Sequence, residues 1–285
     1  MNIKNGLAMW HYPHRSTIEN VEFFTKCGFD ILSLHRAQVT DSVLSADNGA
    51  SLARVLKDNG RTITVHGALP ISHAKEDVRD YMRNILNIAD WQKRYGLIEI
   101  LSFDVLDPIR DDMRGYIDFA LDKVPDCKIA VEDFGLNDNE LAQIEHLRGS
   151  DRFGYLIDIG HMNIRLTGKP AVDLTLFRNC GFEGELAEKP GYEQFLAAFR
   201  SKTFPIFEIH LHNNNGIDDM HYFLEDGVLD IGIIAKVLKE IKYSGIVTIE
   251  SAPGYMFKCF GNEADERMIK TFRYWKEIID STVLN

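Results

Sequence analysis

Short extended runs alternate with amphipathic segments along the whole chain, and this alternation constrains the fold more than any other feature of the sequence. The extended runs lie at residues 6–10, 30–34, 62–66, 98–103, 128–132, 155–158, 207–212 and 246–250. Strict alternation is typical of a parallel sheet whose connections are helices, and eight such units predict a closed (β/α)8 TIM barrel of the α/β class. An open doubly wound sheet would instead require a glycine-rich phosphate loop after the first strand, and the segment that follows Gly6 has no such loop.

Apolar residues at helical spacing mark the segments between the runs. Met82, Ile85, Leu86 and Ala89 lie on one side of such a segment, which predicts an amphipathic helix. Similar patterns predict helices at residues 17–26, 50–58, 76–94, 113–123 and 139–147, near the end of 165–202, between the last two strands, and after the last strand. No linker or low-complexity segment interrupts these units, so residues 1–285 are predicted to form one domain.

Five of the extended runs carry, at or near their C-terminal end, a side chain that can bind a metal ion: His66, Glu132, Asp158, His210 and Glu250. Successive side chains of a strand point to opposite faces, so in these runs small or polar residues share a face with the terminal ligand and bulky aliphatic residues occupy the other. The active site of a TIM barrel lies at the C-terminal ends of its strands. The pattern therefore predicts a ring of metal ligands that faces into the barrel at that end.

The charge and the apolar segments limit the partners that we expect. The chain carries 43 acidic residues against 32 Lys and Arg, a formal charge of -11, which is unfavourable for binding a phosphate backbone. No stretch approaches the roughly 18 apolar residues of a membrane span, and the N-terminus has no signal-peptide pattern. We therefore expect a soluble, cytoplasmic protein that binds neither nucleic acid nor membrane, and whose four scattered cysteines are reduced.

Five segments, in this order and at barrel spacing, resemble the xylose isomerase-like TIM barrels, a superfamily that includes sugar isomerases, sugar epimerases and endonuclease IV. The segments are VHGALP, AVEDFG, LIDIGHMNI, EIHLHNNNGIDDMHYFLEDGVLD and IVTIESAP. The resemblance implies that Glu132, Asp158, His210 and Glu250 hold one divalent cation. Three carboxylates and one imidazole suit Mn²⁺, Mg²⁺ or Co²⁺, whereas a second patch that is richer in histidine would favour Zn²⁺.

The resemblance also implies a reaction, the isomerisation or epimerisation of a small-molecule sugar, either a ketose or a polyol-derived sugar. The cation would stabilise an enediolate while Glu132 and Glu250 remove and return a proton, and His161 would contact a substrate oxygen. The expected substrate-binding residues are His66, Trp10 and His212. Because His212 shares a face with His210, a second reading places it behind the metal ligands. The sequence is compatible with a monomer or a homo-oligomer.

The alternative function is that of an endonuclease IV-like zinc phosphodiesterase that acts on abasic DNA or on another phosphodiester. His161, Asp219 and His221 match zinc ligands of that enzyme, which makes them candidates for a second metal, and His66 matches another. Ser102 stands near the place where the nuclease supplies a further histidine, and this departure favours sugar chemistry. A catalytically silent barrel that binds a metal or a sugar is the third and least favoured hypothesis.

The asparagine run at residues 213–215 has two interpretations. The amides are candidates for binding substrate hydroxyls, but an asparagine run directly before Gly216 is also a common turn signal. The sequence does not identify the sugar, because specificity in this fold comes from the loops after the strands.

Overall fold

The computed structural model describes residues 2–9, 15–35, 38, 46–133, 135–167, 189–256 and 259–283. Its eight strands form a closed barrel in chain order, which confirms the predicted (β/α)8 TIM barrel. The strands are β1 (Lys4–Ala8), β2 (Ile31–His35), β3 (Thr62–Ala68), β4 (Ile98–Asp104), β5 (Lys128–Glu132), β6 (Phe153–Asp158), β7 (Ile206–Leu211) and β8 (Ile246–Ile249).

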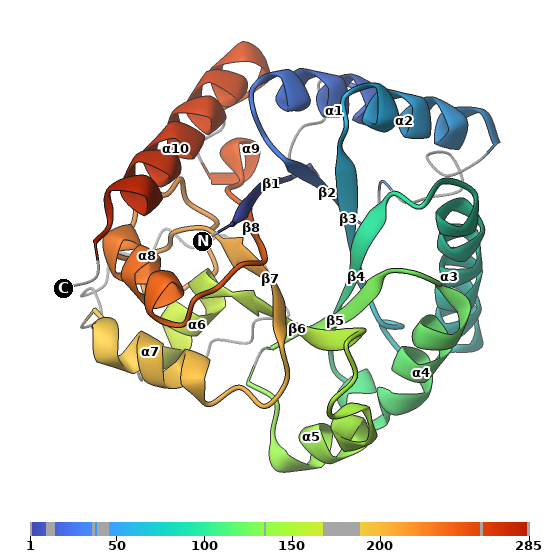
Figure 1. Cartoon of the computed structure of the whole chain (residues 1–285). Coiled ribbons are helices and arrows are strands. Elements are labelled where there is room, and N and C mark those ends of the chain that lie inside the picture. Colours follow the sequence, from blue (N-terminus) through green and yellow to red (C-terminus); the bar gives the residue numbers. More distant parts are fainter. Residues whose placement is uncertain are drawn as a thin grey trace. The chain divides into compact units, whose positions relative to one another are not determined.

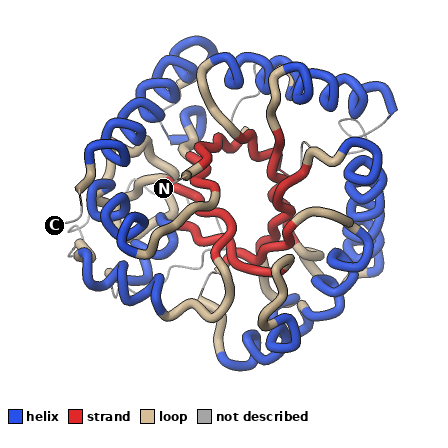
Figure 2. Tube along the Cα trace, viewed as in Figure 1, coloured by secondary structure: helices blue, strands red, loops and turns tan. Residues whose placement is uncertain are grey.

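Helices follow the strands in the predicted alternation (Figure 2). They are α1 (Thr17–Lys26), α2 (Ala46–Asp58), α3 (Lys75–Tyr95), α4 (Arg114–Lys123), α5 (Asp138–Ile144), α6 (Ile159–Leu166), α7 (Tyr192–Arg200), α8 (Ile231–Glu240), α9 (Pro253–Met256) and α10 (Gly261–Ser281). Three differences from the prediction are clear: α2 begins four residues before residue 50, and neither α6 nor the short helix α9 was predicted. Among the described helices, none combines the length and the apolar character that a membrane crossing needs.

The chain divides into two compact units, and each is described by itself. The N-terminal unit comprises Asn5–Leu156 and Thr203–Glu208. The C-terminal unit comprises Met1–Lys4, Ile157–Lys202 and Ile209–Asn285. The prediction that residues 1–285 form one domain stays a prediction.

In the N-terminal unit, the strands β1 to β5 are parallel neighbours, and the helices α1 to α4 lie outside them (Figure 1). The register pairs His35 with His66 and His66 with Ser102, while Ala68 pairs with Asp104. The polar residues at the C-terminal ends of β2, β3 and β4 therefore lie side by side.

The two faces of these strands differ as the alternation predicts. Thr64, on the polar face of β3, donates its hydroxyl to Glu208 at 3.0 Å. Val65, on the other face, lines a cavity of about 60 Å³ together with side chains of α3, including Ile85 and Ile88. The aliphatic face of β3 thus packs against α3, and the polar face of β3 points to the opposite side.

Local capping signals explain where several helices begin. Ser16 precedes α1 and accepts a hydrogen bond from the backbone N–H of Glu19, and the Glu19 carboxylate accepts one from the backbone N–H of Ser16. This reciprocal pair satisfies two N–H groups that the first turn of a helix leaves without partners. It sets the start of α1 at Thr17, as the sequence predicts.

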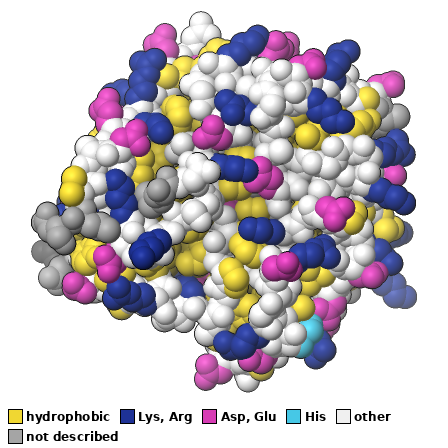
Figure 3. Space-filling view, in the orientation of Figure 1, with side chains coloured by type: hydrophobic (Ala, Val, Ile, Leu, Met, Phe, Trp, Pro, Cys, Tyr) yellow, Lys and Arg dark blue, Asp and Glu magenta, His cyan; other side chains and the backbone are white. Residues whose placement is uncertain are grey.

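Charged residues of both signs are mixed on the surface drawn in Figure 3. Lys and Arg side chains lie between Asp and Glu side chains over that face, so the described residues there do not separate into basic and acidic areas. Cys27, Cys127 and Cys259 are free thiols, and Cys180 lies outside the described residues.

Candidate metal centre

Asp158 is both the last residue of β6 and the N-cap of α6. Its Oδ1 accepts a hydrogen bond of 2.7 Å from the backbone N–H of His161, in the first turn of the helix. Its Oδ2 is buried and accepts no hydrogen bond within the described part of the chain. The carboxylate thus starts the helix with one oxygen and keeps the other available for a ligand. An Asp directly before a helical segment is a helix-start signal, and it could have predicted α6.

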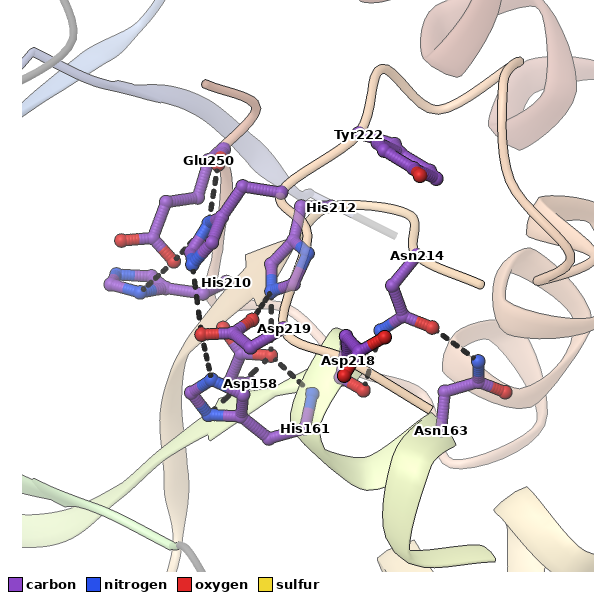
Figure 4. A network of polar contacts seen from close by, with 12 residues as sticks. Asp158, His161, Asn163, His210, His212, Asn214, Asp218, Asp219, Tyr222 and Glu250 are labelled. Carbon is purple, nitrogen blue, oxygen red and sulfur yellow. Dashed lines mark hydrogen bonds and ion pairs between the residues drawn. The ribbon is translucent and has the colours of Figure 1, made fainter. Parts of the chain in front are cut away.

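Three of the four predicted metal ligands come together in the C-terminal unit. Asp158, His210 and Glu250 each place one ligand atom within 4.8 Å of the others, and all three side chains are buried. The His210 Nδ1 and the Glu250 Oε2 are 3.0 Å apart. We call these three residues the carboxylate-rich group. Figure 4 shows Glu250 beside His210 and Asp158 below them.

A second set of possible ligands lies beside the first and contains more histidine. His161, His212, Asp219 and His221 also place one ligand atom each within 4.8 Å of one another. The sequence predicted three of these four as a second metal site and assigned His212 to substrate. We call the four residues the histidine-rich group. The Nε2 of His212 lies 3.2 Å from the Asp158 Oδ1, so the two groups are in contact (Figure 4).

The backbone fixes the orientation of two imidazoles in the histidine-rich group. The Nδ1 of His212 lies 3.2 Å from the carbonyl oxygen of Asn213, and the Nδ1 of His221 lies 2.9 Å from the carbonyl oxygen of Glu250. The two rings stack with their centroids 3.9 Å apart. Histidines that bind metals usually donate the second ring N–H to a carbonyl or carboxylate in this way.

Asparagines hold the loop that carries the histidine-rich group. Asn213 is buried, and its amide donates to the carbonyls of Leu224 and Leu229. The amide of Asn214 donates to the carbonyl of Gly160, and its oxygen accepts from Asn163 at 2.8 Å. Of the two interpretations of this run, the structure therefore supports the structural one for Asn213 and Asn214.

The charges of the histidine-rich group are strongly coupled. Burial raises the pKa of Asp219, but His221 and His161 outweigh it and hold this pKa well below its ordinary value. Burial lowers the pKa of His221, but Asp219 above all outweighs it and raises this pKa to about 10. The pKa of Asp158 is also lowered, because His161 and His212 outweigh the effect of burial. The carboxylates therefore stay ionised beside a protonated imidazole, and a divalent cation would have to displace that proton from the ring nitrogen.

The N-terminal unit has a polar cluster of its own, which we call the His66 cluster: His66, Ser102, Asp104 and Glu132. The Nδ1 of His66 lies 3.0 Å from the Ser102 hydroxyl, and its Nε2 lies 3.0 Å from Asp104 and 3.6 Å from Glu132. Burial raises the pKa of Asp104, but His66 above all outweighs it and lowers this pKa to about 2.

Asp104 is the functional candidate that the sequence reasoning missed. It follows Ser102 by two residues, so the two side chains share a face of β4. The prediction ended this strand at residue 103, one residue too early. The predicted ligand Glu132 belongs to the N-terminal unit, where it contacts His66. Its assignment to the same metal as Asp158, His210 and Glu250 stays a prediction. Trp10 lies outside the described residues.

The residues of the C-terminal unit fit a divalent cation. The carboxylate-rich group supplies oxygen ligands and one imidazole, which suits Mn²⁺, Mg²⁺ or Co²⁺, and the buried Asp158 Oδ2 has no hydrogen bond that a metal would have to replace. The histidine-rich group supplies three imidazoles and one carboxylate, which suits Zn²⁺.

Comparisons with known proteins identify a relative by sequence and solved structures of similar fold. A protein of Methanocaldococcus jannaschii described as uncharacterized is 26% identical over 162 residues, which are 56% of this chain and 46% of that protein. A D-tagatose 3-epimerase-like protein has a TM-score of 0.64 at 19% identity, over 99% of this chain and 100% of the other. The D-psicose 3-epimerase of Clostridium cellulolyticum H10, crystallised with D-tagatose, has a TM-score of 0.65 at 12% identity, over 97% and 99%.

A further structure of similar fold is an IOLI protein with a bound zinc atom. Its TM-score is 0.67 at 14% identity, over 99% of this chain and 100% of that one. Identities this low establish the fold alone. The family model described as xylose isomerase-like TIM barrel matches residues 21–278, which is most of the sequence. The chain therefore belongs to the xylose isomerase-like TIM barrel family.

Proposed function

We propose that the protein is a divalent-metal-dependent isomerase or epimerase of a ketose or of a polyol-derived sugar. The observation that carries this proposal is the carboxylate-rich group: two buried carboxylates and one imidazole whose ligand atoms lie within 4.8 Å of one another. Buried carboxylates that converge without a counter-charge repel one another. A bound divalent cation removes this cost.

A cation in the carboxylate-rich group would polarise a substrate carbonyl and stabilise the negative charge that develops on its oxygen. Glu250 is the candidate for moving a proton on carbon, because its carboxylate is almost fully buried in the described structure and lies 3.0 Å from His210. His161 is a candidate for donating a hydrogen bond to a substrate oxygen. The assignment of the second proton-transfer carboxylate to Glu132 rests on the sequence.

The solved structures of similar fold support the class of substrate. Two of them are described as a D-tagatose 3-epimerase-like protein and a D-psicose 3-epimerase, and a third as an L-ribulose 3-epimerase. Each of these descriptions names a ketose epimerase. We extend the class of reaction to this chain and leave the individual sugar open.

Metal binding and deuterium incorporation test the proposal together. Calorimetry with Mn²⁺ should show binding that Asp158→Asn weakens. An unchanged Mn²⁺ affinity in that variant would contradict the assignment of Asp158 as a metal ligand. A panel of ketopentoses, ketohexoses and polyol-derived ketones is then incubated with the Mn²⁺ protein in D₂O. The product should carry deuterium at the carbon that exchanges its proton, and unlabelled product at full turnover would refute the mechanism.

Glu250→Gln provides the matched test of the proton-transfer role. General acid–base groups contribute about 10²- to 10⁴-fold to rate, so kcat should fall by at least about 100-fold. Glu266→Gln alters an exposed glutamate of α10 and should leave kcat unchanged. Equal rates for the two variants would exclude Glu250 from the chemistry.

The histidine-rich group favours a second candidate function, a zinc phosphodiesterase. A duplex with one abasic site and a simple aryl phosphodiester are suitable probes. We expect no cleavage of either. Cleavage that is lost in Asp219→Asn would replace the isomerase proposal with the hydrolase.

A further inference from the structure

The imidazole of His212 is enclosed by other groups of the C-terminal unit. The side chain is fully buried, and its ring stacks on that of His221 with the centroids 3.9 Å apart and 18° between the planes. Its Nδ1 lies 3.2 Å from the carbonyl oxygen of Asn213, so the loop backbone holds this side of the ring. The Nε2 on the other side is directed at carboxylates of the two ligand groups.

The Nε2 of His212 contacts a predicted metal ligand. It lies 3.2 Å from the Oδ1 of Asp158 and 3.5 Å from the Oδ1 of Asp219 (Figure 4). The same Oδ1 of Asp158 accepts the backbone N–H of His161 at 2.7 Å. The Oδ2 of Asp158 is buried and accepts no hydrogen bond from the residues that the structure describes. Protein groups thus hold one oxygen of Asp158 and leave the other to a cation.

The backbone of α6 leaves room for the His212 ring. A Cβ built on Gly160 would lie 2.0 Å from the Cε1 and 2.3 Å from the Nε2 of His212, which no side chain can tolerate. Gly160 lies within α6 and has an ordinary helical backbone, so its conformation does not demand glycine. The absence of a side chain here serves the close approach of the imidazole to the start of the helix that Asp158 caps.

We infer that His212 is a positioning residue for Asp158. It restrains the Oδ1 of this carboxylate, so that the Oδ2 stays available to the cation of the carboxylate-rich group. In this role His212 touches neither the cation nor the sugar, and it acts on both through Asp158. The inference rests on the proposed isomerase and deepens it, because it assigns a task to a histidine that the chemistry itself does not use.

Two substitutions of His212 separate its two nitrogens. His212→Asn keeps an amide near the position of Nδ1 and loses the group at Nε2, whereas His212→Gln places an N–H donor near the position of Nε2. Partners that orient a metal ligand change metal affinity by about 10- to 100-fold when they are removed, so His212→Asn should weaken Mn²⁺ binding at least about tenfold in calorimetry. His212→Gln should restore most of this affinity.

His73→Asn changes an exposed histidine before α3 and is the control for the histidine substitutions. Its Mn²⁺ affinity should equal that of the unsubstituted protein. If His212→Asn also binds Mn²⁺ with unchanged affinity, or if His212→Gln binds it as weakly as His212→Asn, the inference is overturned.

A double-mutant cycle with Asp158→Ala shows whether His212 acts through this carboxylate. Urea unfolding in EDTA supplies the measurement without any metal. His212→Asn should lower the urea midpoint of the unsubstituted protein by more than it lowers the midpoint of Asp158→Ala, because the contact with Asp158 is already lost there. Equal shifts in both backgrounds would show a general structural role and would overturn the inference.

Gly160→Ala tests the geometry and leaves every ligand in place. Its Cβ must displace the His212 ring, so Mn²⁺ affinity should fall, whereas Gly115→Ala in α4 adds a Cβ that meets no atom within 4 Å and should change nothing. In a His212→Ala background there is no ring to displace, so adding Gly160→Ala should have little further effect. A loss that persists in that background, or no loss in Gly160→Ala alone, counts against the inference.

These measurements follow metal binding and unfolding, whereas the proposed function is tested by turnover of a ketose. Turnover with deuterium incorporation, together with an Mn²⁺ affinity that ignores His212→Asn, would keep the proposed function and overturn this inference. The expected effects of the His212 variants without turnover of any ketose would do the reverse. An unsubstituted protein that binds no Mn²⁺ would overturn both.

Discussion

The histidine-rich group and the His66 cluster both place imidazole rings beside carboxylates in a buried setting. The contacts that hold the rings differ between the two clusters. In the histidine-rich group, backbone carbonyls orient two of the rings, and the residues come from α6 and from the 212–221 loop. In the His66 cluster a serine hydroxyl supports the single ring, and every member lies on the strands β3, β4 or β5.

This difference shows what each cluster needs in order to form. Strand register alone brings His66 next to Ser102, so the His66 cluster forms as soon as the strands of the N-terminal unit pair. The histidine-rich group depends on contacts between residues far apart in the sequence, such as Asn214 with Asn163 and with Gly160. Substitutions that leave the ligands intact should therefore disturb the histidine-rich group more than the His66 cluster.

The largest effect is expected for Asp219→Asn. Removing one partner of a buried charged network leaves the others uncompensated, and three imidazoles face this carboxylate, so the free energy of unfolding should fall by about 3 kcal/mol. Urea denaturation in EDTA measures it. Asp218→Asn, one residue earlier, should cost less than about 1 kcal/mol. Equal losses for both variants would mean that the network does not stabilise the fold.

Asn214→Ala should have the next largest effect. The substitution removes the hydrogen bonds to Gly160, Asn163 and Gly216, all inside the C-terminal unit, and should cost about 2 to 3 kcal/mol. Asn215→Ala loses bonds to partly exposed backbone amides and should cost about 1 kcal/mol. A smaller loss for Asn214→Ala than for Asn215→Ala would contradict the proposed support of the loop.

Acid should weaken the His66 cluster through Asp104. The pKa of this carboxyl is lowered from 3.8 to about 2, so its ionised form stabilises the fold fully above about pH 4, and that contribution is lost as the pH falls toward 2. The loss should be about 2 kcal/mol between these limits. Denaturation midpoints in EDTA from pH 5 to 2 measure it. If Asp104→Asn shows the same acid dependence as the unsubstituted protein, another group causes it.

Ser102→Ala should have the smallest effect. It removes one hydrogen bond to the His66 Nδ1, at a cost of about 1 kcal/mol, while Asp104 and Glu132 still hold the ring through Nε2. Ser33→Ala, at a buried position of β2 on the other side of β3, controls for the loss of a buried hydroxyl. If Ser102→Ala lowered the free energy of unfolding as much as Asn214→Ala does, the two clusters would not differ in the way described.

Periodic patterns predicted the barrel because each strand and each helix carries its own signal. The predicted ligands Asp158, His210 and Glu250 were found in the same way, since each lies at or near the end of an extended run. Asp104 was missed by one residue of strand length, and α6 was missed because it follows β6 without a loop. The hydrogen bond by which Asn213 holds its loop could not be predicted, because its partner Leu229 is 16 residues away and no local sequence pattern links the two residues.

Asp158 belongs to the secondary structure and to the ligand chemistry at once. The amide proton of His161 is bonded to the same carboxylate that faces the candidate metal centre. Hydrogen exchange at this single amide therefore reports on ligand binding. A ligand that restrains the Asp158 side chain should slow the exchange of the His161 amide, and a ligand that binds elsewhere should leave it unchanged. The start of α6 can be followed as a readout of site occupancy even when the substrate is unknown.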